Sequence, residues 1–165
     1  MSTKADATIE DLYRVPDHRK AELVNGEVVL MSPTGAAPNF AGGEIFASLR
    51  DFARRTKSGR AVTDSAGFRV NLPHRESLSP DAAFYVGQTS GMTFFEGAPV
   101  FAAEVRGEND YGPQVVWDVD LLSADTVKVY RVSDPDKPTI YRRGEIAEAK
   151  PAVSGWKMPV DDLFE

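Results

Sequence analysis

The chain has 165 residues, 42% of them hydrophobic and 27% charged, which is the composition of one globular domain. Nineteen Lys and Arg stand against twenty-five Asp and Glu. The resulting net charge of −6 argues against nucleic-acid binding by bulk positive charge, although a local basic patch stays compatible with it. The sequence contains no Cys, which excludes disulfides, a thiol nucleophile and Cys-based metal sites. We expect a single domain over residues 1–165, with residues 1–7 as a disordered tail.

No apolar run approaches the roughly 18–20 residues that a membrane helix needs. The first residues are polar and lack the apolar core of a signal peptide. We therefore expect a cytoplasmic protein that is not inserted in a membrane.

The strongest local signal near the N-terminus is a β-hairpin over residues 20–31 (KAELVNGEVVLM). The Asn25-Gly26 pair at its centre is typical of a type I′ turn, in which both central residues need a positive φ. A short helix over residues 8–12, capped by Thr8, is predicted just before it.

One long helix is predicted over residues 39–57. Its apolar side chains recur at helical spacing, a glycine follows its last turn, and Asn39 is a suitable N-cap. Basic residues gather at its C-terminal end: Arg50, Arg54, Arg55, Lys57 and Arg60. They either complement the helix dipole or contact a phosphate backbone.

The rest of the chain is predicted to be mostly β-structure. One straight or bent strand is expected over residues 60–72, and a loop with a last helical turn at the C-terminus. The other expected strands are 81–86, 99–105, 115–120, 126–132 and an edge strand at 138–142. The mixture predicts an α+β (α/β-like) domain with a central mixed β-sheet, an N-terminal hairpin and one long flanking helix.

Three carboxylates lie in or beside these apolar strands: Glu22, Asp81 and Glu104. An unpaired carboxylate in a buried strand costs several kcal/mol, so a cationic side chain or a bound cation should offset each one. Oxygen ligands that converge from neighbouring strands suit Mg²⁺ or Mn²⁺. Alternatively, each carboxylate points outward from an alternating strand.

The segments ELVNGEVV, SPDAAFYV, APVFAAEV, VVWDVD and VKVYRV follow one another in an order that resembles the Uma2 family (DUF820). That family is similar to the restriction-endonuclease-like nucleases of the PD-(D/E)xK superfamily. The resemblance extends from about Thr8 to the C-terminal LFE and implies a restriction-endonuclease-like fold.

The resemblance also implies roles for individual residues. Glu22 matches the family's early glutamate, Asp81 the aspartate of the Pro-Asp motif, and Glu104 the acidic member of the (D/E)xK pair. In the superfamily the latter two carboxylates hold a divalent metal, and a lysine stabilises charge at the attacked phosphate.

The chain departs from the pattern at that lysine. Arg106 occupies its position, and no Lys occurs between Lys57 and Lys128. Arg106 can hold phosphate oxygens but cannot act as a base, because it stays protonated. Alternatively, it is a surface or ion-paired residue. In Uma2 relatives a lysine lies on a helix after the glutamate strand, and residues 107–114 are too short and too rich in Gly and Pro for that helix.

The short connection has several explanations. In the first, the strand at 115–120 pairs elsewhere or antiparallel, because a parallel crossover takes roughly a dozen residues or more. Otherwise the chain is a natural or engineered deletion that has lost the lysine-bearing helix. If residues are instead missing from the sequence as given, the intact mass will exceed 18.0 kDa.

Two functions follow as expectations. The first is an Mg²⁺-dependent (or Mn²⁺-dependent) endonuclease that hydrolyses DNA, with Asp81 and Glu104 as metal ligands and Glu22 and Arg106 completing the catalytic set. The second is a catalytically inactive, homodimeric scaffold or binding module that retains the nuclease fold. Its apolar surface is expected on the strands from Val115 onward, because they lack a covering helix.

Overall fold

The computed structural model describes residues 6–89, 91–106 and 116–164. Their contacts group into two compact units, which are described separately. The expectation of a single domain stays a prediction. Residues 1–5 of the expected tail and the short connection at 107–114 lie outside the described residues. Within the described part of the tail, the backbone N–H of Ala7 donates to the Gly26 carbonyl at 2.8 Å.

The first unit comprises residues 1–33, 65–79 and 88–98. Its elements are α1 (Ile9–Tyr13), η1 (Pro16–His18), β1 (Ala21–Val24), β2 (Glu27–Leu30), β4 (Phe68–Leu72), β5 (Arg75–Leu78) and β7 (Phe95–Glu96). The strands form one sheet in the order β2-β1-β5-β4-β7. The predicted hairpin is confirmed as β1 and β2, because Asn25 and Gly26 have φ of 50° and 71° and Val24 pairs with Glu27.

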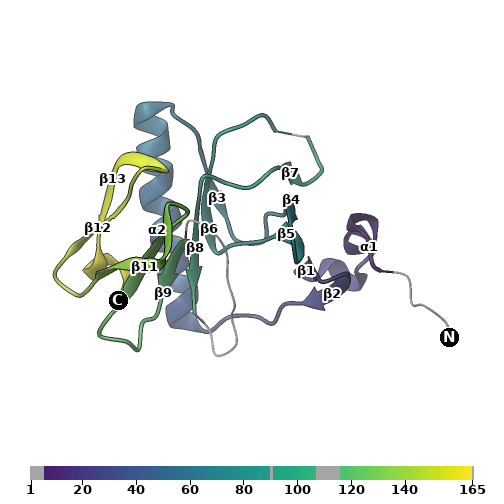
Figure 1. The fold of residues 1–165 in the computed structure, drawn as a ribbon, viewed down its shortest axis with the longest axis horizontal. Coiled ribbons are helices and arrows are strands. Elements are labelled where there is room, and N and C mark those ends of the chain that lie inside the picture. The colour runs from purple at the N-terminus through teal and green to yellow at the C-terminus, as the bar shows by residue number, and fades with distance from the viewer. Residues whose placement is uncertain (1–5, 90, 107–115, 165) are drawn as a thin grey trace. The chain divides into compact units, whose positions relative to one another are not determined.

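The second unit comprises residues 34–64, 80–87 and 99–165. Its helices are α2 (Ala36–Thr56) and η2 (Val160–Leu163), and its strands are β3 (Arg60–Thr63), β6 (Ala82–Tyr85), β8 (Phe101–Val105), β9 (Val116–Val119), β10 (Val127–Arg131), β11 (Asp134–Tyr141), β12 (Ile146–Ala149) and β13 (Val153–Pro159). Six strands form a mixed sheet in the order β11-β10-β9-β8-β6-β3, and β12 and β13 form a separate hairpin (Figure 1). The predicted α+β class, with a mixed sheet and one long helix, is confirmed.

The sheet of the second unit has one parallel pair, β8 with β9, in which Ala102 lies opposite Val116 and Val105 opposite Val119. The expectation that the strand after residue 114 pairs elsewhere or antiparallel is therefore wrong. A return over a few residues of strand needs only about 10 Å of chain, which a short connection spans without a full crossover helix.

The core of the second unit lies between this sheet, α2 and the β12–β13 hairpin. Ile45 and Leu49 on α2 are fully buried, as predicted from their spacing. The rings of Trp117 and Trp156 lie 4.7 Å apart, and the Trp117 indole N–H donates to the Glu148 carbonyl. Because β9 is buried at Val116, Trp117 and Val119, the apolar docking surface expected from Val115 onward is not exposed on β9.

Three other expectations need correction. The long helix begins at Ala36 with Gly35 as its N-cap, so Asn39 lies inside it. The segment 60–72 is two strands in different sheets, β3 and β4, separated by a turn at Asp64-Ser65. The segment before the last helical turn is strand β13 rather than a loop.

Candidate functional site

Asp81 and Glu104 lie side by side at one end of the β6–β8 pair. Ala82 pairs with Ala103 in an antiparallel register, so Asp81 and Glu104 are the next residues along the two backbones. The Asp81 carboxylate is fixed there, because its Oδ2 accepts a hydrogen bond from the backbone N–H of Val105 at 2.8 Å. The backbones of two of the predicted site residues are thus neighbours.

The alternation of β8 determines which way Glu104 points. Ala103 and Val105 face the core beneath α2, so Glu104 lies on the opposite face of the sheet. It is partly exposed, whereas its strand neighbours are buried. The carboxylate therefore stays within reach of solvent although its strand is part of the core.

A cavity of about 190 Å³ lies against the N-terminal half of α2, and Asp81 lines it. A Cβ added at Gly42 would lie 3.3 Å from the Cβ of Asp81, so the buried glycine lets the helix approach this carboxylate closely. The other lining residues are Thr34, Pro38, Asn39, Gly43, Phe46, Thr63 and Asp64.

Arg106 lies at the end of β8, on the same face as Glu104. Its backbone N–H donates to the Val119 carbonyl at 2.8 Å and continues the β8–β9 ladder. Its guanidinium makes a two-pronged ion pair with Asp118, in which Nε donates to Oδ1 and Nη2 to Oδ2. These hydrogen bonds raise the pKa of Arg106 above its already high value, so the guanidinium stays charged and cannot serve as a base.

Glu22 belongs to the first unit, where it is buried on β1. Its Oε2 forms an ion pair with Arg75 Nη1 at 3.1 Å, and its Oε1 accepts a hydrogen bond from the backbone N–H of Ser79 at 2.9 Å. The cost of burying this carboxylate is therefore offset by a cationic side chain, one of the two possibilities that the sequence left open.

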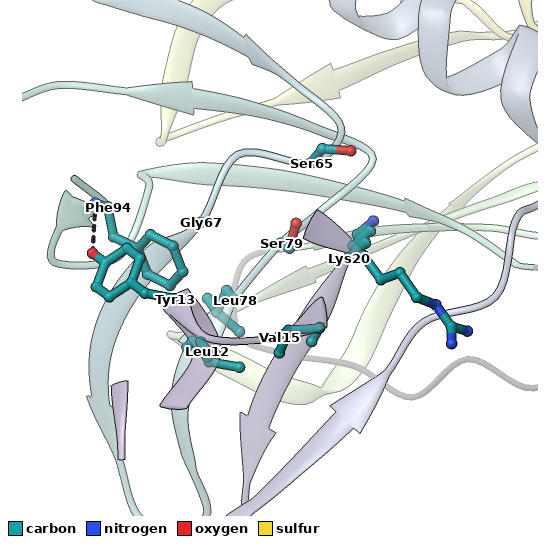
Figure 2. Close-up of a pocket in the computed structure, with 12 residues that line it drawn as sticks. Leu12, Tyr13, Val15, Lys20, Ser65, Gly67, Leu78, Ser79 and Phe94 are labelled. Atoms are coloured by element: carbon teal, nitrogen blue, oxygen red, sulfur yellow. Dashed lines mark hydrogen bonds between the residues drawn. The ribbon is translucent and has the colours of Figure 1, made fainter. Parts of the chain in front are cut away.

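The first unit also holds a cavity, of about 240 Å³ (Figure 2). On one side the rings of Tyr13 and Phe94 lie 4.9 Å apart, and the Tyr13 hydroxyl accepts a hydrogen bond from the Phe94 backbone N–H. Arg19, Lys20 and three serines form the polar part of the lining. Leu12, Val15 and Leu78 also line it, so the cavity has an apolar part and a polar part.

Sequence reasoning missed two residues that the register places in line with the predicted carboxylates. Asp118 is the direct partner of Glu104 on β9, and Asp64 follows Thr63, which pairs with Ala82 next to Asp81. In the sequence, Asp118 alternates with Trp117 and Val119, a pattern typical of any half-exposed strand. No sequence signal singled out Asp64, because the strand that ends at Thr63 was expected to continue to residue 72.

Metal-binding capacity rests on oxygen ligands. Within residues 6–89, 91–106 and 116–164, no three His, Asp or Glu side chains are arranged to hold one metal ion together. The pair Asp81 and Glu104 offers carboxylate oxygens, the ligand type that Mg²⁺ takes together with several waters.

None of the helices in the described part of the chain is long and apolar enough to cross a membrane.

Comparison with known proteins identifies the fold of the chain and the family to which it belongs. The chain is similar to a crystal structure of "a putative nuclease belonging to DUF820" from Anabaena variabilis ATCC 29413, with a TM-score of 0.75, 15% sequence identity, and coverage of 95% of this chain and 97% of that one. This likeness establishes the restriction-endonuclease-like fold predicted from the sequence.

A family model described as "Putative restriction endonuclease" matches residues 9–161. The chain therefore belongs to the Uma2 family, and the predicted resemblance is confirmed. A comparison with curated proteins finds no match.

Proposed function

We propose that the protein hydrolyses phosphodiester bonds of DNA with the help of Mg²⁺ or Mn²⁺. The observation that supports this most is the hydrogen bond from the backbone N–H of Val105 to the Asp81 carboxylate, which ties Asp81 to the strand that carries Glu104. Membership in a family described as a restriction endonuclease supports this reaction class.

In this proposal Asp81 and Glu104 hold the metal through their oxygens. A bound Mg²⁺ supplies positive charge that activates water and stabilises the attacked phosphate. The hydrogen bond from Val105 orients Asp81 before any ligand arrives. Arg106 holds a phosphate oxygen and adds permanent positive charge on the Glu104 face, but it removes no proton.

Glu22 takes no direct part in the proposed reaction. Both of its oxygens are engaged inside the first unit, by Arg75 and by the Ser79 backbone. Its proposed role is to hold β1 and the end of β5 together.

The test is cleavage of supercoiled plasmid and single-stranded DNA with Mg²⁺, Mn²⁺ or EDTA. We expect cleavage by the wild type only with metal, and a loss of at least about 100-fold in D81N and E104Q, because each removes one charged ligand. Asp136→Asn, which neutralises an exposed carboxylate on β11, is the matched control and should cleave normally. Equal cleavage by wild type and D81N would sink the proposal.

A homodimeric binding module is the second candidate, supported by a different surface from the one first expected. β2 is an edge strand, and Val29 and Leu30 on it are 42% and 46% exposed. An open edge with apolar side chains can pair with a second copy of the chain. Sedimentation over a wide concentration range tests this: we expect a dimer that V29K weakens, and a monomer throughout would exclude it.

A further inference from the structure

Asp118 and Arg106 form an ion pair on the face of the sheet that carries Glu104. The sheet register places Asp118 directly beside Glu104, because these two residues are partners in the parallel β8–β9 pair, which lies in the middle of the sheet (Figure 1). The Asp118 side chain is only 16% exposed, whereas Arg106 is 47% exposed. The carboxylate is therefore the sheltered partner, and the guanidinium is the one that solvent or a ligand reaches.

The geometry of this ion pair leaves part of the guanidinium available. Arg106 uses Nε and Nη2 for the two oxygens of Asp118. No hydrogen bond among the described residues uses Nη1. A guanidinium has five N–H donors in one plane, so the edge formed by Nη1 and the second hydrogen of Nη2 remains able to bind two oxygens at once.

We propose that Asp118 is a positioning residue that holds Arg106 so that this remaining edge receives a phosphodiester group beside Glu104. The inference rests on the proposed function, since a phosphodiester is the substrate group assumed there. It adds the residue that turns a mobile arginine into an oriented phosphate contact.

Two other roles for Asp118 make different predictions. If Asp118 merely neutralises Arg106, removing it strengthens the contribution of Arg106 to phosphate binding. If Asp118 only stabilises the strand pair, removing it leaves that contribution unchanged. If Asp118 orients Arg106, removing it weakens the contribution, because an unrestrained side chain loses rotamer entropy on binding. The sign of the coupling therefore separates the three.

The experiment is a double-mutant cycle on binding of a fluorescein-labelled DNA duplex in EDTA, with wild type, R106Q, D118A and R106Q/D118A. We expect R106Q to weaken binding roughly tenfold in the wild-type background and only about twofold in the D118A background. R106Q should also reduce the slope of log K against log[salt] by about 0.9, the value for one phosphate contact.

Arg143 and Asp161 provide the matched control, since they form an exposed Arg–Asp pair in the same unit. R143Q and D161A should leave binding and its salt slope unchanged. D118N, which keeps the shape of Asp118, replaces D118A if thermal unfolding shows that D118A is not folded. An equal or larger effect of R106Q in the Asp118 variant would overturn the inference, and so would a lack of measurable binding by the wild type.

The outcome is independent of the cleavage test, because no metal is present. Coupling between Arg106 and Asp118 without any metal-dependent cleavage would retain the phosphate contact and reject the hydrolysis. Cleavage that needs Asp81 and Glu104, without this coupling, would reject only the role of Asp118.

Discussion

In the first unit, Arg75 is the cation that faces the buried carboxylate of Glu22. The ion pair spans 3.1 Å, and the two side chains are 18% and 7% exposed. Removing only the cation leaves a buried charge without its partner, which typically costs about 3 kcal/mol or more. We expect Arg75→Met to lower the free energy of unfolding by about 3 kcal/mol in a urea titration.

Removing both charges tests whether this cost is electrostatic. Glu22→Gln keeps an oxygen for the backbone N–H of Ser79, so E22Q in combination with R75M buries no charge. The double variant should be more stable than R75M alone by about 1 kcal/mol or more. If the two losses simply add, then Arg75 acts through packing rather than through the charge of Glu22.

At the scale of residues, the sequence predicted which carboxylates need compensation but not what compensates them. Glu22 stands out because charge in an apolar segment is costly, yet its partner Arg75 lies 53 positions further along the chain. The Asp118–Arg106 pair depends on the parallel register of β8 and β9, whereas the short segment 107–114 favoured a different pairing. Pairing across strands is decided by packing of whole strands, which no local pattern records.

Among the elements, α2 illustrates a glycine needed for close packing next to one that is not. Both Gly42 and Gly43 lie inside the helix, where replacement by Ala usually stabilises by about 1 kcal/mol. A Cβ at Gly43 meets nothing within 4 Å, whereas a Cβ at Gly42 comes within 3.3 Å of Asp81. The two positions therefore form a matched pair of substitutions.

We expect Gly43→Ala to raise the free energy of unfolding by about 0.5–1 kcal/mol and to leave cleavage unchanged. Gly42→Ala should gain less stability and should lower cleavage roughly tenfold, because Asp81 must shift by a few tenths of an ångström. Urea unfolding and plasmid cleavage measure the two effects. Identical behaviour of both variants would show that the approach of α2 to Asp81 is unimportant.

Prediction from sequence worked best for elements whose signals are local. The hairpin follows from Asn25-Gly26, and the middle of α2 follows from apolar spacing. The start of α2 was placed three residues late because Asn39 is a good N-cap in isolation, although the chain caps the helix at Gly35. The break between β3 and β4 was missed although Asp64, Ser65 and Gly67 form turns readily, because apolar residues on both sides continue a strand-like pattern.

For the whole molecule, the division into two units has no sequence signal. Each unit is assembled from three separate segments, and the chain passes from one to the other in short Gly-, Pro- and Ser-containing turns that look like ordinary loops between strands. Composition and charge, by contrast, are known in full from the sequence. They set the long-range field that a DNA phosphate meets before any specific contact forms.

The last prediction concerns the effect of this field on DNA binding. With a net charge of −6, the protein repels DNA overall, and Asp81 and Glu104 add repulsion at the place where the phosphate should lie. In EDTA and low salt, D81N and E104Q should therefore bind duplex DNA more tightly than the wild type, by about fivefold. Asp136→Asn changes the net charge by the same amount on the edge strand β11 and should improve binding less than twofold.

Fluorescence anisotropy at two salt concentrations measures this difference. Raising the salt from about 0.05 to about 0.2 M should shrink the advantage of D81N and E104Q, because the Debye length then falls below about 10 Å and the charges are screened from the DNA. Adding Mg²⁺ should reverse the order, since the wild type then gains a bridging cation that the variants hold poorly. An equal gain in all three variants would mean that only net charge matters, and the pair Asp81 and Glu104 would then not be where DNA binds.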